Sequence, residues 1–327
     1  MLIPNAILKP LEWTGRQGTR AVASLVIIGI ALPSIGAALK PFVSEAVFIL
    51  LCIAFLRTDI SAIKTHIRYP TLIIVATTWT SVAIPFLFGF GCRAFGLSER
   101  APELFLGLML QAVASPMMAA PALAALMGLD TTLVLITLIA STTLIPFTAP
   151  LFAHLFIGPT LSVSPAMLAI KLFTIITGAA IVGFCLRRFF GMRTIERHKY
   201  RIDGINIFVL FVFVAAIMEG VGSRVLITPM IFVVFASIAF VVFFVILFLT
   251  ILLFRSSGWK KALALGFMVS QRNMGLMLAA TSGALPELTW FYFAVSQFPI
   301  YLSPYLLQPL TRRVLGAEKM RLDIDIQ

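Results

Sequence analysis

Long runs of apolar residues, separated by short polar stretches, dominate the hydrophobic pattern of this chain. Most of the runs are long enough for an α-helix to cross the hydrocarbon core of a bilayer, which takes about 20 residues. The pattern therefore predicts an all-α integral membrane protein with ten transmembrane helices. The predicted spans are residues 21–39, 42–56, 71–92, 103–127, 131–157, 165–186, 205–221, 229–254, 261–283 and 289–310.

The ten predicted spans divide into two halves of five that follow the same plan. In each half the third span is long, the fourth is interrupted by polar or proline residues, and the fifth contains two prolines. Because each half has an odd number of spans, the second half is inverted relative to the first. The plan predicts two inverted five-helix repeats, as in many secondary transporters, within a membrane unit of residues 21–186 and 205–310.

The distribution of basic residues predicts the orientation of the chain in the membrane. With 60% hydrophobic residues, 12% charged residues and a mean hydropathy of +1.05, the chain is too apolar for a soluble domain. Nineteen of the 25 Lys and Arg residues fall on the side shared by both termini, and positive charge accumulates on the cytoplasmic side. We therefore expect a multi-pass protein of the cell membrane with cytoplasmic segments at 1–20, 187–204 and 311–327. This topology explains the net charge of +12, so the lipid bilayer, and no nucleic acid, is the expected partner.

The most informative polar residues interrupt the fourth and ninth spans. Four consecutive polar residues, Arg272 among them, stand at mid-bilayer depth in the ninth span, where a charge is costly unless it faces protein or water. The fourth span is broken at Ser115 and Pro116. Interrupted helices at matching places in two halves indicate the binding site of a transporter. The candidate substrate-binding residues are Arg272, Ser270, Gln271, Asn273, Ser115, Pro116, Thr80, Gln111 and Gln297.

Three stretches of the chain resemble the bile acid:sodium symporter family. The residues Ala114-Ser115-Pro116 are similar to the family's Cys-Pro-Gly-Gly turn, and Val269 to Gly275 are similar to its Glu-Val-Gly-Met-Gln-Asn-Ser-Gly segment. The resemblance implies a panel domain of helices 1, 2, 6 and 7 and a core domain of helices 3, 4, 5, 8, 9 and 10. It also implies that helices 4 and 9 cross at their unwound centres, with substrate bound between the domains. The similar stretches are residues 54–85, 107–150 and 266–304.

This chain departs from the family at the positions that would bind sodium. On this alignment Met268 stands where the resemblance implies a sodium-binding glutamate, and Arg272 where it implies a glutamine. Ala120 and Pro121 replace a Ser-Asn pair, and Thr80 replaces a further glutamine. Sodium is a hard cation that needs a cage of oxygen ligands. The sequence therefore argues against sodium coupling through the family's ligands, and it suggests no metal site or cofactor.

Arg272 has two interpretations from the sequence. In the first, its guanidinium supplies the positive charge that sodium supplies in relatives and holds the carboxylate of a small organic anion, the expected substrate. In the second, it is structural and bonds carbonyl groups freed by the helix break, at Met117, Ala119 or Ala120. Both interpretations require the arginine at the crossing.

Glu219 is the candidate for coupling transport to protons, since it is the acidic residue deepest in the second half's apolar segments. The alternative is a carboxylate in the outer leaflet that reaches water. Two other functions remain: a membrane sensor or subunit that kept the fold without transport, and a proton-coupled antiporter-like carrier. We do not expect an enzyme, because His, Cys and carboxylate residues form no cluster within the spans.

Overall fold

The computed structural model describes residues 9, 12–13, 24, 29–31, 33–58, 70–158 and 161–325. The regular elements in these residues are helices, which confirms the all-α class. Six helical stretches in the same residues are long and apolar enough to cross a membrane, judged by length and composition. The arrangement of ten spans in two inverted repeats stays a prediction. The six stretches are Pro33–Arg57, Pro70–Ala94, Thr131–Ile157, Pro165–Phe190, Lys199–Ile227 and Pro229–Ser257.

Proline residues open several of the helices between residues 70 and 190. Pro70, Pro102 and Pro165 each occupy the first position of a helix, where the fixed φ suits the first turn and the missing N–H costs nothing. The α11 helix is instead capped by Asp130, whose carboxylate accepts from the Leu133 N–H at 3.0 Å. The elements are α3 (Pro33–Leu39), η1 (Lys40–Phe42), α4 (Val43–Arg57), α6 (Pro70–Thr78), η2 (Trp79–Ala83), α7 (Ile84–Ala94), α8 (Leu97–Arg100), α9 (Pro102–Val113), α10 (Ala120–Leu126), α11 (Thr131–Phe152), η3 (Ala153–Ile157) and α12 (Pro165–Phe190).

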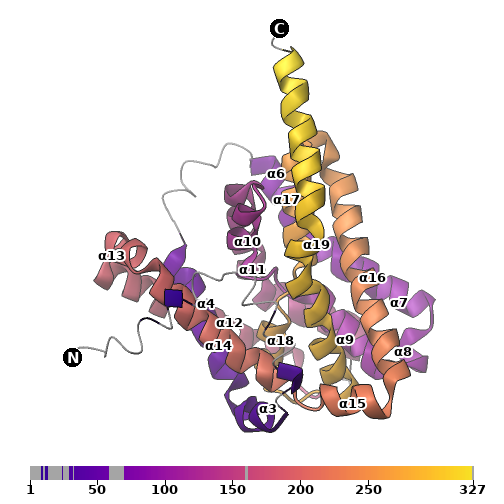
Figure 1. Ribbon diagram of the computed structural model, residues 1–327. Coiled ribbons are helices and arrows are strands. Elements are labelled where there is room, and N and C mark those ends of the chain that lie inside the picture. The colour runs from indigo at the N-terminus through magenta and orange to yellow at the C-terminus, as the bar shows by residue number, and fades with distance from the viewer. Residues whose placement is uncertain are drawn as a thin grey trace.

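Helices in the second half run into segments expected to lie outside the membrane unit. The predicted linker 187–204 contains the end of one long helix, a short helix and the start of the next. The last helix continues far into the predicted tail and projects beyond the rest of the bundle (Figure 1). The elements are α13 (Met192–Arg197), α14 (Lys199–Ile217), α15 (Val221–Ile227), α16 (Pro229–Phe254), η5 (Arg255–Ser257), α17 (Trp259–Ser270), α18 (Met274–Ala280) and α19 (Glu287–Asp325).

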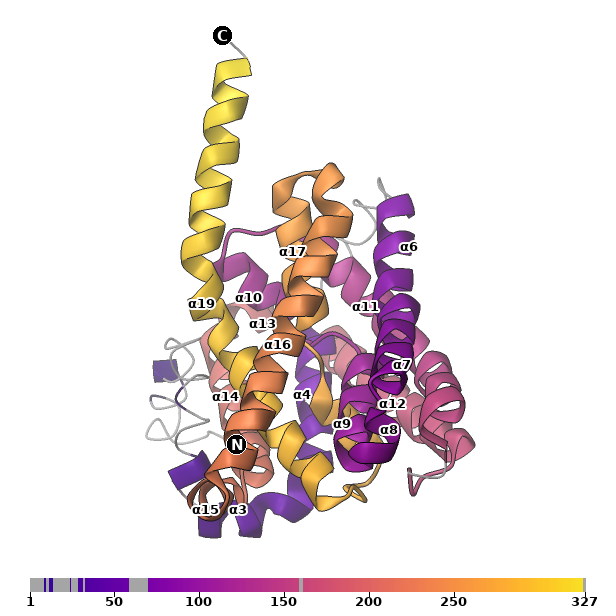
Figure 2. The same cartoon turned by 90° about the vertical axis from the view of Figure 1, so that its right-hand side faces the viewer.

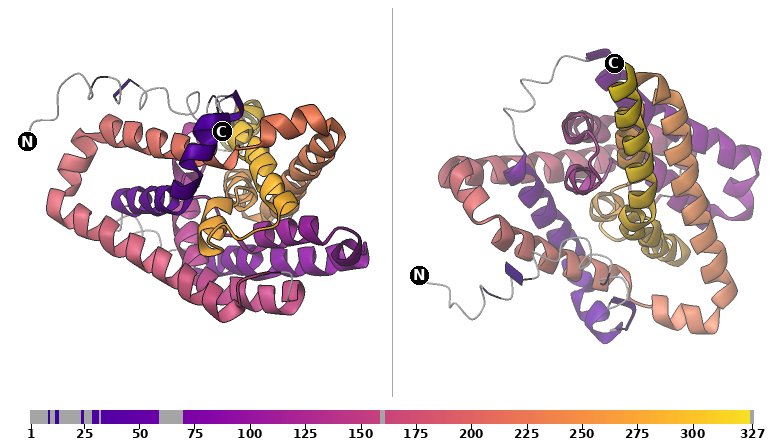
Figure 3. Two further views of the ribbon diagram at one scale, coloured as in Figure 1. Left: turned by 90° about the horizontal axis from the view of Figure 1, so that it is seen from below. Right: turned by 45° about the horizontal axis from the view of Figure 1, so that its top comes forward.

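The helices pack mainly within two sets. In the first, the α4 group, α4 packs between α12 and α14, and α14 also packs against α3 (Figure 3). In the second, the crossing group, α16 packs against α17 and α19, α9 against α7 and α19, and α11 against α6, α10 and α17. The two groups meet where α11 contacts α12 and where α18 contacts α4 and α12.

The two ends of the bundle differ in the elements that they carry. The helices α3, α8 and α15 lie at one end, and the end of α19 projects from the other (Figure 2). The predicted topology places the α3 end outside the cell, so we call it the outer end.

Small residues let the helices of the α4 group approach closely. A Cβ atom on Gly183 of α12 would lie 2.7 Å from the Phe55 Cβ and 2.8 Å from the Cys52 carbonyl oxygen of α4. A larger residue at position 183 would therefore push α4 and α12 apart, because backbone atoms cannot move aside as a flexible side chain can. Close contact of this kind is the usual basis of helix association in membranes, where lipid is as apolar as the side chains.

Candidate functional site

The two broken helices cross and join through their backbones. Between α9 and α10 the chain is extended at Pro116, and between α17 and α18 it is extended at Arg272, where the two segments form an antiparallel bridge. The Met117 N–H donates to the Gln271 carbonyl at 2.6 Å, and the Asn273 N–H donates to the Ser115 carbonyl at 2.7 Å. These bonds satisfy backbone groups that a helix break would otherwise leave unpaired in an apolar setting. The asparagine also caps α18, since its side-chain oxygen accepts from the Leu276 N–H at 3.1 Å.

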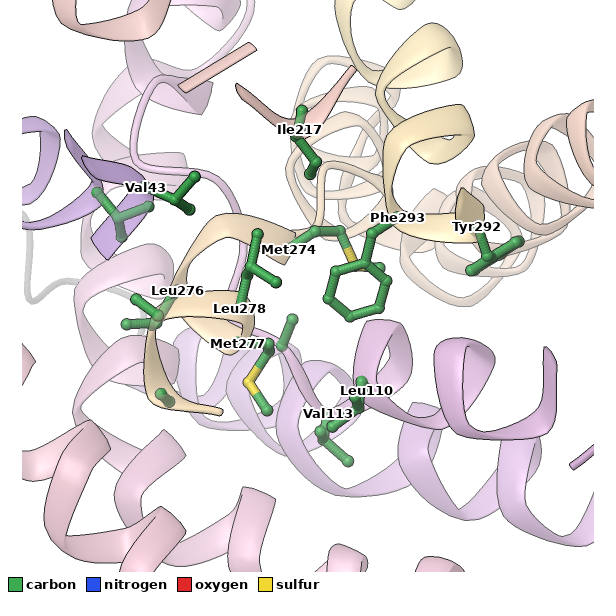
Figure 4. Packing of buried hydrophobic residues seen from close by; sticks show 14 of the residues in the cluster. Val43, Leu110, Val113, Ile217, Met274, Leu276, Met277, Leu278, Tyr292 and Phe293 are labelled. Carbon is green, nitrogen blue, oxygen red and sulfur yellow. The ribbon is translucent and has the colours of Figure 1, made fainter. Parts of the chain in front are cut away.

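The outer half of this crossing is packed on several sides. Figure 4 shows Met274 and Met277 of α18 among Val43 of α4, Val113 of α9 and Phe293 of α19. All of these side chains are buried. The short helix α18 thus joins the α4 group to the crossing group.

The Arg272 side chain is 1% exposed and bonds two main-chain carbonyl oxygens. Its Nη1 donates to the Ala114 oxygen at 2.9 Å and to the Thr80 oxygen at 3.4 Å. Its Nη2 lies 3.5 Å from the Thr80 oxygen, and its Nε has no hydrogen-bond partner. The ion pairs found among the described residues involve other groups. Within the described chain, carbonyl dipoles alone therefore compensate this buried charge.

The Thr80 carbonyl is available because of a proline in the third span. At η2 the chain forms a π-helical turn, in which the Ile84 N–H donates to the Trp79 oxygen, five residues earlier. In that register the donor for the Thr80 oxygen would come from position 85. That residue is Pro85, which has no N–H. The Arg272 guanidinium supplies the missing donor.

The Ala114 carbonyl is available because α9 ends at the residue before it. Ala114 has an extended conformation, with φ −63° and ψ 150°. The last carbonyls of a helix have no partners within it and carry partial negative charge. The guanidinium next to the end of α9 therefore donates a hydrogen bond to the Ala114 oxygen, and its positive charge is attracted to the negative end of the helix dipole. The structural interpretation of Arg272 named the wrong carbonyls, at Met117, Ala119 and Ala120; the bonded ones are at Ala114 and Thr80.

Gln271 bonds a carbonyl that a second proline frees. Its Nε2 donates to the Ile300 oxygen of α19 at 3.2 Å and to the Ser303 hydroxyl. In a regular α-helix the Ile300 oxygen would accept from position 304, which is Pro304. The Ser303 hydroxyl also donates to the Ile300 oxygen, at 2.9 Å. The crossing thus supplies donors to two carbonyls that lack a backbone donor because of prolines, one in the third predicted span and one in the tenth. The Gln271 Oε1 atom is buried without a partner.

The structure divides the other candidate residues into two sets. Ser115 and Pro116 lie in the crossing itself, and the Ser115 hydroxyl is buried without a partner. Ser270 and the Thr80 hydroxyl bond carbonyls of their own helices, at 2.9 and 2.7 Å. Hydrogen bonds hold the two remaining glutamines elsewhere: Gln111 accepts from the Tyr292 hydroxyl, and Gln297 donates within α19.

Further hydroxyl groups that are buried without partners come from the helices around the crossing. They belong to α6 and to α11, which packs against α6, α9 and α17. Buried polar atoms normally have a protein or water partner, so this region is suited to a polar occupant. The residues are Thr77, Thr137, Ser141 and Thr142.

Glu219 lies at the outer end and is paired with a cation. Its Oε2 is 2.7 Å from the Lys40 Nζ, and the two side chains are 30% and 47% exposed. It is therefore a partly exposed, ion-paired carboxylate, and its role in proton coupling stays a prediction.

A model of the sodium bile acid symporter family matches residues 45–228, more than half of the chain. The chain belongs to this family. No curated protein matched the sequence. The matched range runs from α4 to α15 and includes the Ser115 break, whereas Arg272 lies beyond it.

The contacts of the crossing in this sodium bile acid symporter family member include residues that the motif comparison did not single out. Pro85, Pro304 and Ser303 act on the site through the carbonyls they free or the hydroxyl they offer. The signal for the first two was present in the sequence as prolines in the middle of predicted spans. Ser303 carried no such signal, because serines are common in membrane helices and are usually satisfied locally.

The Gln271 contact leads to a prediction from paired substitutions. Gln271→Leu is expected to destabilise the protein by about 1–2 kcal/mol, because it removes the amide donor that the buried Ile300 oxygen and the Ser303 hydroxyl share and leaves that oxygen with the Ser303 hydroxyl as its one donor. In a Pro304→Ala background the cost should fall by about 1 kcal/mol, since the new N–H at position 304 can take its place. Equilibrium unfolding in mixed detergent micelles measures both values. Equal costs in the two backgrounds would refute this explanation of the contact.

Proposed function

We propose that this family member is a secondary transporter that carries a small organic anion by alternating access, with Arg272 as a fixed cation at the crossing. The observation that supports the proposal is a fully buried guanidinium with two carbonyl partners and no carboxylate paired to it within the described residues. Burying a charge without a counter-ion costs several kcal/mol, and an anion would offset that cost. The guanidinium Nε–H is a donor still without a partner.

The same geometry argues against sodium at this position. A metal cation needs oxygen ligands, and here the guanidinium already bonds the carbonyl oxygens of Ala114 and Thr80. A sodium ion about 5 Å from the guanidinium would be repelled by about 3 kcal/mol at an effective dielectric constant of 20. An anion at the same distance would be attracted by a similar amount. We infer that Arg272 attracts the negative charge of the substrate and that no sodium ion binds beside it.

The proposed movement assigns the α4 group to a panel domain and the crossing group to a core domain, together built as two inverted repeats of five spans. Contacts of α4 with both α12 and α14 support one body, and contacts among α16, α17 and α19 support the other. Alternating access would then rock one body against the other about the crossing.

A proton-coupled carrier is the second candidate. Its proposed coupling residue, Glu219, is ion-paired with Lys40 at the outer end and is partly exposed, whereas Arg272 is fully buried. This placement favours a carrier whose positive charge at the crossing is permanent. The sensor or subunit without transport remains the alternative if no anion binds.

The proposal predicts sodium-independent stabilisation by an anion. Purified protein would be heated with a panel of small carboxylates and bile-acid-like anions, each in sodium and in choline salts of the same ionic strength. A ligand at a hundredfold excess over its Kd stabilises the native state by about 2.7 kcal/mol, which shifts the unfolding midpoint measurably. Stabilisation that is equal in both cations supports the proposal. Stabilisation that needs sodium would refute the role of Arg272, and no stabilisation by any anion would favour the sensor.

A further inference from the structure

Trp290, near the start of α19, is held at the outer end by residues of the α4 group. Its indole N–H donates to the Ile217 carbonyl oxygen at 3.3 Å. The Lys40 Nζ lies 4.9 Å from the centroid of the indole ring. The same ammonium is 2.7 Å from the Glu219 carboxylate. We call these four residues the Trp290 latch.

The local backbone explains why an indole N–H is bound there. Ile217 is the last residue of α14, and the turn that follows is closed by bonds from Met218 to Val214 and from Val221 to Met218. The Ile217 oxygen receives no bond from this turn. Exposed carbonyls at a helix C-terminus carry partial negative charge and favour a donor. The Lys40 ammonium over the indole face adds a second attraction between the α4 group and α19.

Another contact joins the two groups at the same end, where the Lys171 Nζ of α12 donates to the Ser282 hydroxyl at 2.7 Å. Beside it, Arg224 of α15, a helix that packs against α16, pairs with Glu287 at the start of α19. Ser282 has a φ of 54°, a left-handed conformation that is uncommon for a residue other than glycine. The turn that leads into α19 is therefore shaped to reach the α4 group.

A cavity of about 370 Å³ lies beside the latch and is lined by Trp290, Lys40, Glu219 and Arg224 among others. The indole packs against the buried core on one side, and the open space on the other side gives the ring room to leave the Ile217 carbonyl. Trp290 itself is only partly buried. The latch is thus a contact that can open, unlike the Arg272 contacts, which are fully buried.

We propose that the Trp290 latch is the outer gate of the transporter: while it is formed, the α4 group and the crossing group stay closed at the outer end. Release of Trp290 from Ile217 and Lys40 permits their separation there. The gate rests on the proposed alternating-access function, but its test needs neither a known substrate nor transport. Lys40 and Trp290, which lie outside the two helix breaks, control the opening of the outer end in this scheme.

The test measures the separation of the two groups directly. Spin labels would be placed on Ser34→Cys of α3 and Glu99→Cys of α8, both exposed at the outer end, after replacement of Cys52, Cys92 and Cys185 by alanine. Electron–electron double resonance then gives the distribution of distances between the labels in lipid nanodiscs. Trp290→Ala should raise the ratio of separated to closed molecules about tenfold, since it removes one hydrogen bond and one cation–π contact.

Two conservative variants keep the test decisive if the alanine variant folds poorly. Trp290→Phe retains a ring under Lys40 and loses the N–H donor, so it should give a smaller increase, and Lys40→Met should also raise the ratio. Trp259→Ala is the matched control, because Trp259 is an exposed tryptophan at the first turn of α17. Unchanged distances in all three latch variants would overturn the gate. Altered distances without stabilisation by any anion would keep the gate and reject the anion carrier.

Discussion

Replacing Arg272 by methionine is expected to lower the free energy of unfolding by about 2–4 kcal/mol and to abolish anion binding. The substitution leaves the buried carbonyl oxygens of Ala114 and Thr80 without a donor, each at a cost of about 1–3 kcal/mol. Part of that cost is offset, because burying a guanidinium is itself unfavourable. The loss of charge removes the attraction for the substrate entirely. Thermal unfolding with and without the stabilising anion measures both effects.

Two further substitutions at this position separate the charge from the hydrogen-bonding shape. Arg272→Lys keeps the charge but not the planar fork, so anion stabilisation should survive while intrinsic stability falls. Arg272→Gln keeps donors but not the charge, so it should lose anion stabilisation. If Arg272→Lys and Arg272→Gln lose anion binding equally, the planar arrangement of the guanidinium donors, and not the charge alone, is required to bind the anion. If all three variants still bind the anion, Arg272 is structural.

The sequence predicted the all-α class and the two helix breaks that meet at the crossing. Helix breaks at Ser115 and Arg272 could be recognised because polar residues in an apolar span cannot be left unpaired. The family match later confirmed the resemblance on residues 45–228. The all-α class followed from hydropathy alone, whereas the lengths of α12 and α19 did not, since helices continue past the bilayer wherever propensity and packing permit.

The partners of Arg272 could not be predicted from the sequence. The pairing with Thr80 depends on a π-helical turn that shifts the hydrogen-bond register by one residue, and nothing in the local sequence distinguishes this turn from a regular helix broken at Pro85. In the regular register the freed carbonyl would be that of Ser81. The Trp290 latch was equally hidden, because Lys40 and Trp290 are 250 positions apart in the chain and meet only in the folded bundle.

A second large effect is expected at Gly275, where α18 touches the α4 group. A Cβ atom on this residue would lie 3.0 Å from the Phe213 Cζ and 3.1 Å from the Val47 Cγ2. Alanine can be accommodated by shifts of a few tenths of an ångström, but leucine cannot. Since the clash falls between the two proposed domains, Gly275→Leu should force them apart and reduce transport at least tenfold. Overpacking of this kind typically also costs about 1–3 kcal/mol of stability.

Two measurements test this expectation in the same protein. Uptake of the stabilising anion into proteoliposomes should fall, and the distance between labels at positions 34 and 99 should increase. Phe213→Ala in the same chain removes the ring that the leucine meets and should restore both values. Gly91→Leu serves as the matched control, because a Cβ there would meet nothing within 4 Å. Normal uptake by Gly275→Leu would show that this contact does not change during transport. Failure of Phe213→Ala to restore uptake would place the damage inside the crossing group, and the movement of the α4 group against it would lose its support.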